Sequence, residues 1–194
     1  MSQGWRGALV MALVGTLVIA FAGIAAGKVK TKTFSSGNLA VDIPGGNPGD
    51  ETSHVQTFNL NKKKFKRAKV KDVDVRLRLS SAHAEDLAIS LSAPRATTIQ
   101  LVPDTPGDHF NEFGSGDESC SGSPTVFNDE AETLATSISG SDPLVGQFRP
   151  TERLSALDGS KVKGKWRLSI VDNDSGAQTL HCAELKIKYK KKRK

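Results

Sequence analysis

Aromatic residues are scarce in this chain of 194 residues, of which 6% are Phe, Trp or Tyr. Binding sites for sugars and for single-stranded nucleic acids usually present exposed aromatic rings on which the ligand stacks. Beyond the N-terminal segment, the only Trp and Tyr are Trp166 and Tyr189, and both occupy apolar positions of strand-like patterns. The composition therefore gives poor support to a dedicated nucleic-acid role and to a sugar-binding platform.

Motifs of nucleophilic hydrolysis are also missing. The sequence contains neither a Gly-x-Ser-x-Gly elbow nor the Gly-Thr-Ser-Met-Ala context of subtilisin-type nucleophiles. The four histidines do not form a His-x-x-x-His pair; they are His54, His83, His109 and His181. We interpret them as surface or packing residues, and we predict that this chain has no catalytic residues.

After Gly27 no apolar three-to-four periodicity persists, which argues against long helices. Apolar residues instead alternate with polar ones over short segments bounded by turn residues, as in residues 73–79, 87–91, 99–101, 166–170 and 183–189. This pattern predicts an all-β, antiparallel β-sandwich. We expect residues 166–171 and 182–189 to close an antiparallel pair of strands around the acidic turn between them.

The N-terminus carries Arg6 followed by an uncharged span, residues 7–27, that is rich in Leu, Val and Ala. Small residues at its end favour a signal peptide cleaved before Lys28, while its length also allows an uncleaved membrane anchor. Either alternative places the remainder outside the cytoplasm, secreted or anchored. We expect a polar linker at residues 28–37, one β domain at residues 38–189 and a basic tail at residues 190–194.

Only two cysteines occur, Cys120 and Cys182. In an exported chain such a pair is more often bridged than free, so we predict a disulfide, with two unpaired thiols as the alternative. A zinc site is disfavoured, because zinc usually takes four protein ligands, or three and a water.

Positive charge is unevenly placed in this chain of net charge +6, since no Lys or Arg occurs between Arg95 and Arg149. Basic runs lie at residues 62–67 and 190–194. These runs favour weak, unspecific contact with polyanions such as anionic lipid, wall polymers or nucleic acid, chiefly through the tail. The alternative interpretation is a solvated loop and a frayed tail.

Carboxylates form a second chemical feature. Asp172 and Asp174 belong to an Asp-x-Asp-x-Gly turn, which is typical of the start of a calcium loop. An EF-hand is excluded, because Ala177 and Ala183 stand where that loop needs Gly and Glu.

Four blocks of the sequence, in order, resemble motifs of one known family. They are Glu85-Asp86-Leu87-Ala88-Ile89-Ser90-Leu91-Ser92-Ala93-Pro94, Asn128-Asp129-Glu130-Ala131, Phe148-Arg149-Pro150 with Leu154-Ser155-Ala156-Leu157-Asp158-Gly159, and Gly164-Lys165-Trp166-Arg167-Leu168-Ser169-Ile170-Val171-Asp172. The family is the P-domain (P/Homo B domain) that follows the catalytic domain of kexin-like and furin-like proprotein convertases. The resemblance spans roughly residues 40–189, and each motif alone is weak.

The resemblance implies a jelly-roll, galactose-binding-like sandwich that packs against a subtilisin-like serine endopeptidase and supports its folding and stability. It also implies calcium, with Asp86, Asp129, Glu130 and Asp172 as candidate ligands; the alternative is that these acids cap turns and face water. The expected partner is a subtilisin-like protease or another envelope protein. A cell-surface adhesion or carbohydrate-binding jelly roll is the alternative function.

Overall fold

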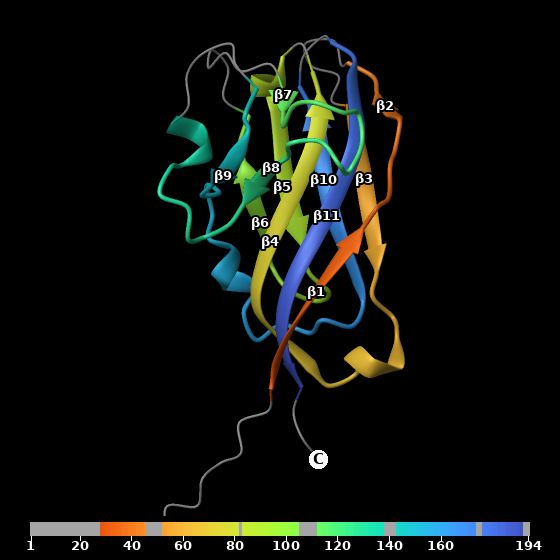
Figure 1. Ribbon diagram of the computed structural model, residues 1–194, viewed down its shortest axis with the longest axis vertical. Helices are drawn as coiled ribbons and strands as arrows, with labels where there is room; N and C mark the ends of the chain where they lie inside the picture. Colours follow the sequence, from red (N-terminus) through yellow and green to blue (C-terminus); the bar gives the residue numbers. More distant parts are fainter. Residues whose placement is uncertain are drawn as a thin grey trace, which may run out of the picture.

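The computed structural model describes residues 28–45, 52–81, 83–104, 112–137, 143–173 and 176–191. Two β-sheets pack face to face, and the described part of the chain contains no α-helix (Figure 1). The predicted all-β sandwich is therefore confirmed. The apolar span at residues 7–27 lies outside the described residues. In the part of the chain that is described, no helix has the length and apolar character needed to span a membrane.

The larger sheet carries the two longest strands side by side at its centre. Its order is β1 (Val29–Ser35), β11 (Gln178–Lys191), β4 (Ala68–Ser80), β8 (Thr125–Phe127) and β9 (Gly146–Phe148), while β2 (Val41–Ile43) pairs with β11 and β7 (Glu112–Phe113) pairs with β4. These strands pair antiparallel, as expected, except that β8 and β9 run parallel.

The smaller sheet has the order β3 (Thr52–Asn59), β10 (Lys165–Asp172), β5 (Leu87–Ser92) and β6 (Thr98–Val102), all antiparallel. The described connections between strands contain four short 3-10 helices: η1 (Lys63–Phe65), η2 (Ala84–Asp86), η3 (Ala135–Ser137) and η4 (Leu154–Leu157). Short strands joined by turns and single-turn helices agree with the turn residues that punctuate the sequence.

The core lies between the sheets and is built by the alternating positions that the sequence marked. On β10 the side chains of Trp166, Leu168 and Ile170 are each 0% exposed. The Trp166 indole N–H donates to the Val162 carbonyl over 3.0 Å, so the largest core side chain has its polar atom satisfied. Burial of this ring removes it from any surface platform.

Residues 28–37 are not the polar linker that the sequence predicted, because most of them form β1. This strand pairs with β11 along its whole length, from Val29 opposite Lys190 to Ser35 opposite Glu184. Both faces of β1 are largely exposed, so the strand shows no apolar alternation and is held by its backbone ladder. Lysines on such an edge also discourage pairing with another chain.

The expected pairing of residues 166–171 with 182–189 is wrong, since β10 and β11 belong to different sheets. Each strand sends its apolar face into the common core, so the two face each other across the sandwich instead of sharing a ladder. The expected tail at 190–194 begins within β11, which extends to Lys191; residues 192–194 lie outside the described part.

Candidate functional site

Two of the predicted calcium ligands, Asp86 and Asp172, lie near one another at one end of the smaller sheet: Asp86 ends η2, just before β5, and Asp172 ends β10. Leu87, the residue after Asp86, is the register partner of Asp172, and the Asn173 N–H donates to the Asp86 carbonyl over 3.3 Å. Asp172 continues the inward face of β10 and is 0% exposed. Its carboxylate accepts a hydrogen bond from the Gln178 amide over 3.2 Å, so it is a buried, partnered group.

Asp129 occupies a different place, after β8, and its carboxylate has a structural role. One oxygen accepts the Leu154 N–H and the other the Ser155 N–H, each over 2.8 Å. These donors open η4, where a short helix leaves backbone N–H groups unpaired, so Asp129 acts as a cap from a distant segment. The Arg153 guanidinium adds a bond to the Asp129 carbonyl over 2.9 Å. These contacts join the Asn128–Ala131 block to the Leu154–Gly159 block.

Glu130 is the only one of the four predicted ligands in a described cluster of acids. Among the described residues, its carboxylate lies within 4.8 Å of those of Asp72 and Asp74, which follow one another on a face of β4. Three carboxylates are a donor set that suits a hard cation. The predicted set of four does not converge, since Asp129 serves η4 and Asp86 and Asp172 lie elsewhere.

Lysines of β11 neutralise this acidic group. Lys186 Nζ lies 2.7 Å from Asp74 and Lys188 Nζ lies 2.6 Å from Asp72. The hydrogen bond to Asp72 raises the pKa of Lys188 above its usual value. A divalent cation would therefore compete with two ammonium groups, which a sequence argument could not show because lysines and acids lie more than 100 residues apart.

An open hollow of about 460 Å³ adjoins this group. Its lining alternates in charge, with Lys71, Asp72, Asp129, Glu130, Arg153, Ser155, Asp158 and Lys188 around it. Burial raises the pKa of Asp158 above its usual value, with Asp72 and Asp129 adding to the effect and Lys71 opposing it. Opposite charges at this spacing satisfy one another, so the hollow is better explained as an ion network than as a catalytic site.

Cys120 and Cys182 are joined by a disulfide across a sequence separation of 62 residues, with their Cα atoms 5.1 Å apart. The bond fixes residues 114–122 against the outer face of the larger sheet. The Cys120 N–H donates to the Asn38 side-chain oxygen over 3.0 Å, which attaches this loop to the chain just after β1. Because the loop covers Arg78, that side chain is 5% exposed and forms an ion pair with Glu112 at 3.0 Å.

A Ser–His contact that the sequence did not predict joins β4 and β11. The Ser80 hydroxyl and His181 Nε2 are 2.8 Å apart across the β4–β11 ladder. Such a pair is the first requirement of a hydrolytic triad, but His181 is only 3% exposed, and burial lowers its pKa below the ordinary value. Because a buried imidazole cannot contact a substrate, we interpret His181 as a packing residue. His83 is exposed, as expected, and His109 lies outside the described residues.

Comparison with known proteins adds a family to this geometry. The family model described as the proprotein convertase P-domain matches residues 70–187, which is more than half of the chain. This stretch contains both sheets from β4 onward and the disulfide. No curated protein sequence matches the chain.

Solved structures of one protease also match. The serine protease of Aeromonas sobria in complex with its chaperone aligns with 14% identity and a TM-score of 0.45, over 86% of this chain and 28% of that chain. The serine protease of Aeromonas sobria alone aligns with 14% identity and a TM-score of 0.45, over 83% of this chain and 27% of that chain. The chain thus spans little more than a quarter of the solved chains it matches.

Proposed function

Because the chain belongs to the proprotein convertase P-domain family, we propose that it is an exported, noncatalytic module that acts by docking to a protein partner. The observation that carries this proposal is the family match over residues 70–187. The partner that we propose is a subtilisin-like serine protease, whose folding and stability the docked module supports. Another envelope protein is the broader class.

The outer face of the smaller sheet supports docking. Alternate positions of its strands point away from the core, and most carry short, uncharged side chains: Ser53, Val55, Thr57, Ala88, Ser90, Ser92, Ser169 and Val171. The cations Lys165 and Arg167 lie on the same face, at the end where β10 begins. Val55 lies opposite Ser169, halfway along the edge strand β3, and is 45% exposed. A broad face of short side chains allows close approach of a partner with little charge to desolvate.

Burial of the chemistry-bearing groups supports a noncatalytic role. In the Ser80–His181 contact the imidazole is 3% exposed. Trp166 and Tyr189 are 0% and 8% exposed, so neither ring offers a stacking platform for a sugar. The disulfide supports an oxidising compartment outside the cytoplasm, because such bonds persist there.

Calcium remains a proposal on the donor set of Asp72, Asp74 and Glu130. A bound cation there would lie beside the Asp129 cap of η4 and would replace the two lysine ammonium groups. Since only the folded chain brings these three acids together, binding would stabilise the fold.

The experiment has two arms. The purified protein should leave a broad panel of fluorogenic peptides uncut, because the Ser–His contact between described residues has a buried imidazole. Turnover abolished by a serine-directed inhibitor would overturn the noncatalytic assignment. Crosslinking in the native envelope should capture a subtilisin-like protease. Recovery of polysaccharide without protein would instead favour the adhesion alternative.

Two valines of matched exposure locate the docking face. Val55 is 45% exposed and Val145, just before β9, is 44% exposed. Val55→Glu places a charge on the outer face of the smaller sheet, and Val145→Glu places the same charge outside that face. We expect Val55→Glu to abolish capture of the partner and Val145→Glu to preserve it, with unchanged melting of both variants. Equal capture by the two variants would exclude this face.

A further inference from the structure

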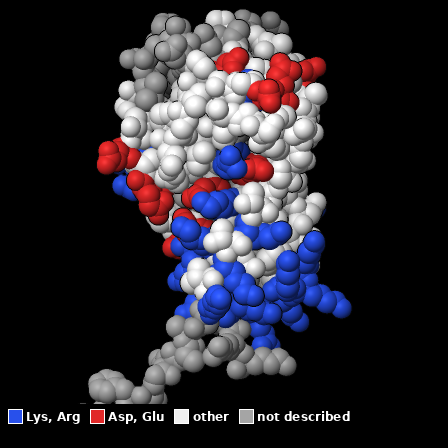
Figure 2. All heavy atoms as spheres, viewed as in Figure 1, with Lys and Arg blue, Asp and Glu red and all other residues white. Residues whose placement is uncertain are grey.

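Segments far apart in the sequence bring cations to one end of the sandwich (Figure 2). This basic end is the end at which β1 begins and β11 finishes, because Val29 pairs with Lys190 (Figure 1). We define it by the cations of the strand ends, of η1 and its flank, and of a cleft described below: Lys30, Lys63, Lys64, Lys66, Arg67, Arg95, Lys161, Lys163, Lys165, Arg167, Lys190 and Lys191. Residues 62–67 therefore share one surface with Lys190 and Lys191, the described part of the C-terminal basic run, which the sequence alone did not indicate.

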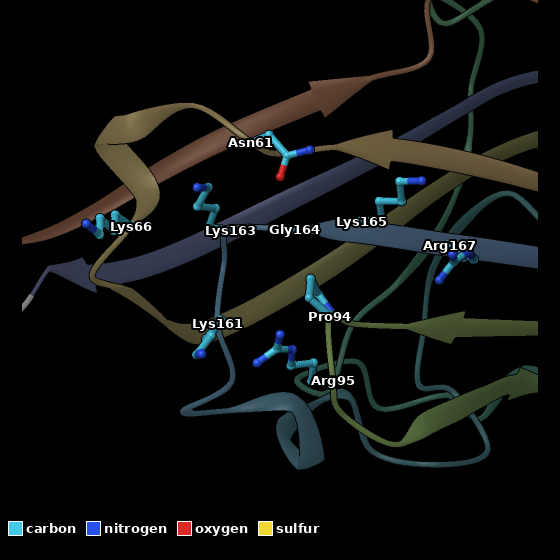
Figure 3. Close-up of a pocket in the computed structure, with 9 residues that line it drawn as sticks. All are labelled: Asn61, Lys66, Pro94, Arg95, Lys161, Lys163, Gly164, Lys165 and Arg167. Carbon is cyan, nitrogen blue, oxygen red and sulfur yellow. The ribbon is translucent and has the colours of Figure 1, made fainter.

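A cleft of about 570 Å³ opens in the basic end (Figure 3). Its lining consists of Asn61, Lys66, Pro94, Arg95, Lys161, Lys163, Gly164, Lys165 and Arg167. Six of these residues are cations and none is an acid, in contrast to the mixed lining of the hollow around Asp129. Figure 3 shows the cations arranged around Pro94 and Gly164, from the β5–β6 turn, the turn after η1 and the approach to β10.

Backbone conformation marks one of these cations. Arg95 has φ of 60°, the left-handed region that residues other than glycine rarely adopt. Strained positions of this kind cluster at ligand-binding sites, where the surrounding structure holds them. The turn thus holds Arg95 in an unfavourable backbone conformation, in which its exposed guanidinium lies at the cleft.

Some cations elsewhere in the described structure form ion pairs, unlike those of the basic end. The ion pairs between described residues use Arg76, Arg78, Lys186 and Lys188, which lie along the sheet rather than at the basic end. The cations of the basic end repel one another, and an external anion would remove that repulsion. The surface is therefore complementary to an extended array of negative charges.

The position of the apolar residues 7–27 in the sequence indicates which kind of anion the basic end meets. The uncharged, apolar residues 7–27 precede β1 with only Lys28 between them, and β1 begins at the basic end. A bilayer that holds or meets this segment lies beside the cations. We propose that the basic end is a docking surface for an anionic phospholipid bilayer, and that the cleft holds headgroup phosphates. This surface adjoins the docking face of the smaller sheet, because Arg167 is the register partner of Thr57 and Ser92.

The full chain in bilayer nanodiscs provides the test. In phosphatidylcholine mixed with phosphatidylglycerol, Lys161, Lys163 and Lys165 should react with an amine-acylating reagent several-fold more slowly than in phosphatidylcholine alone. The protection should disappear in high salt, because the attraction is screened. Lys186, paired with Asp74 at 2.7 Å, is the internal reference. Equal acylation rates of the three lysines in both lipids would overturn the proposal.

Two double variants distinguish binding at the cleft from a general effect of net charge. Arg95→Gly with Arg167→Gln removes two cleft cations and relaxes the strained backbone, so its melting temperature should not fall. Each lost cation should weaken the lipid contact about fivefold, and the protection should largely vanish. Arg76→Gln with Arg149→Gln removes the same charge elsewhere and should retain it. Identical loss in both pairs would show that only net charge matters and would exclude the cleft.

A nucleic-acid arm tests the other extended polyanion. A DNA duplex is added to the full chain in phosphatidylcholine nanodiscs at a phosphate concentration matched to that of the anionic lipid. We expect weaker protection of the three lysines by the duplex. Protection equal to or stronger than that given by phosphatidylglycerol would overturn the assignment to lipid.

Discussion

Gly164 packs so closely on Pro94 that a Cβ atom on Gly164 would lie 2.5 Å from the Cβ of Pro94. The φ of Gly164 is 143°, which side chains also disfavour. We therefore expect Gly164→Ala to lower the free energy of unfolding by about 2 kcal/mol or more. Chemical denaturation checks this. Gly159→Ala is the matched control, since φ there is 75° with nothing within 4 Å, and should cost about 1 kcal/mol. An equal loss of stability in the two variants would show that Pro94 moves aside to accommodate the new Cβ atom.

The disulfide gives the second prediction. Cys120→Ala with Cys182→Ala opens a loop with a sequence separation of 62 residues, and the unfolded chain then regains conformational entropy. On the loop-entropy account the loss of stability is about 4 kcal/mol. Denaturant unfolding of the variant against the oxidised protein measures it. Free alkylation of both thiols without reductant, in protein recovered from outside the cell, would contradict the bridge.

Strands whose inner face is fully apolar could be predicted from the sequence, because alternation reports burial on one side. Val73, Val75, Leu77 and Leu79 are each at most 1% exposed, as their spacing indicated. The edge strand β1 could not, since it buries almost nothing and its pairing with β11 leaves no pattern. Val55 and Phe58 show the same limit: they are three residues apart, so one faces solvent and the other the core.

The site was less predictable, because its contacts join distant segments. The acid at Asp129 could be named from the sequence, but its role as the cap of Leu154 depends on a partner 25 residues away. The cleft around Arg95 draws on several turns that meet only in the fold. A basic run is visible in a sequence; the convergence of separate runs at one end is not.

Substitutions of Asp129 and Glu130 should have different effects, because Asp129 caps η4 and Glu130 belongs to the proposed calcium-binding group. Asp129→Ala leaves the Leu154 and Ser155 N–H groups without their acceptor and should cost about 1 to 2 kcal/mol, equally in calcium and in chelator. Glu130→Ala should leave stability in chelator nearly unchanged and remove any calcium-dependent rise in melting temperature. Thermal melts of both variants measure this. Identical wild-type melts with calcium and with chelator would remove calcium from the account.

His181 predicts a pH dependence of stability. Burial first, and Arg78 to a lesser extent, lower the pKa of His181 in the folded chain below its ordinary value of 6.5, while Glu118 and Glu112 oppose the shift. The unfolded chain therefore takes up a proton at this position before the folded chain does. The contribution is fully present above pH 6.5 and is lost as the pH falls through the folded pKa.

The measurement is the free energy of unfolding between neutral pH and about pH 5, with a slope of at most about 1.4 kcal/mol per pH unit from one group. His181→Gln should remove this part of the slope. Ser80→Ala should lower stability by about 1 kcal/mol through the lost 2.8 Å hydrogen bond, yet retain the slope, because the imidazole stays buried. If wild type and His181→Gln differ by a constant amount across this range, His181 is not the titrating group; loss of the slope in Ser80→Ala would assign the effect to the hydrogen bond.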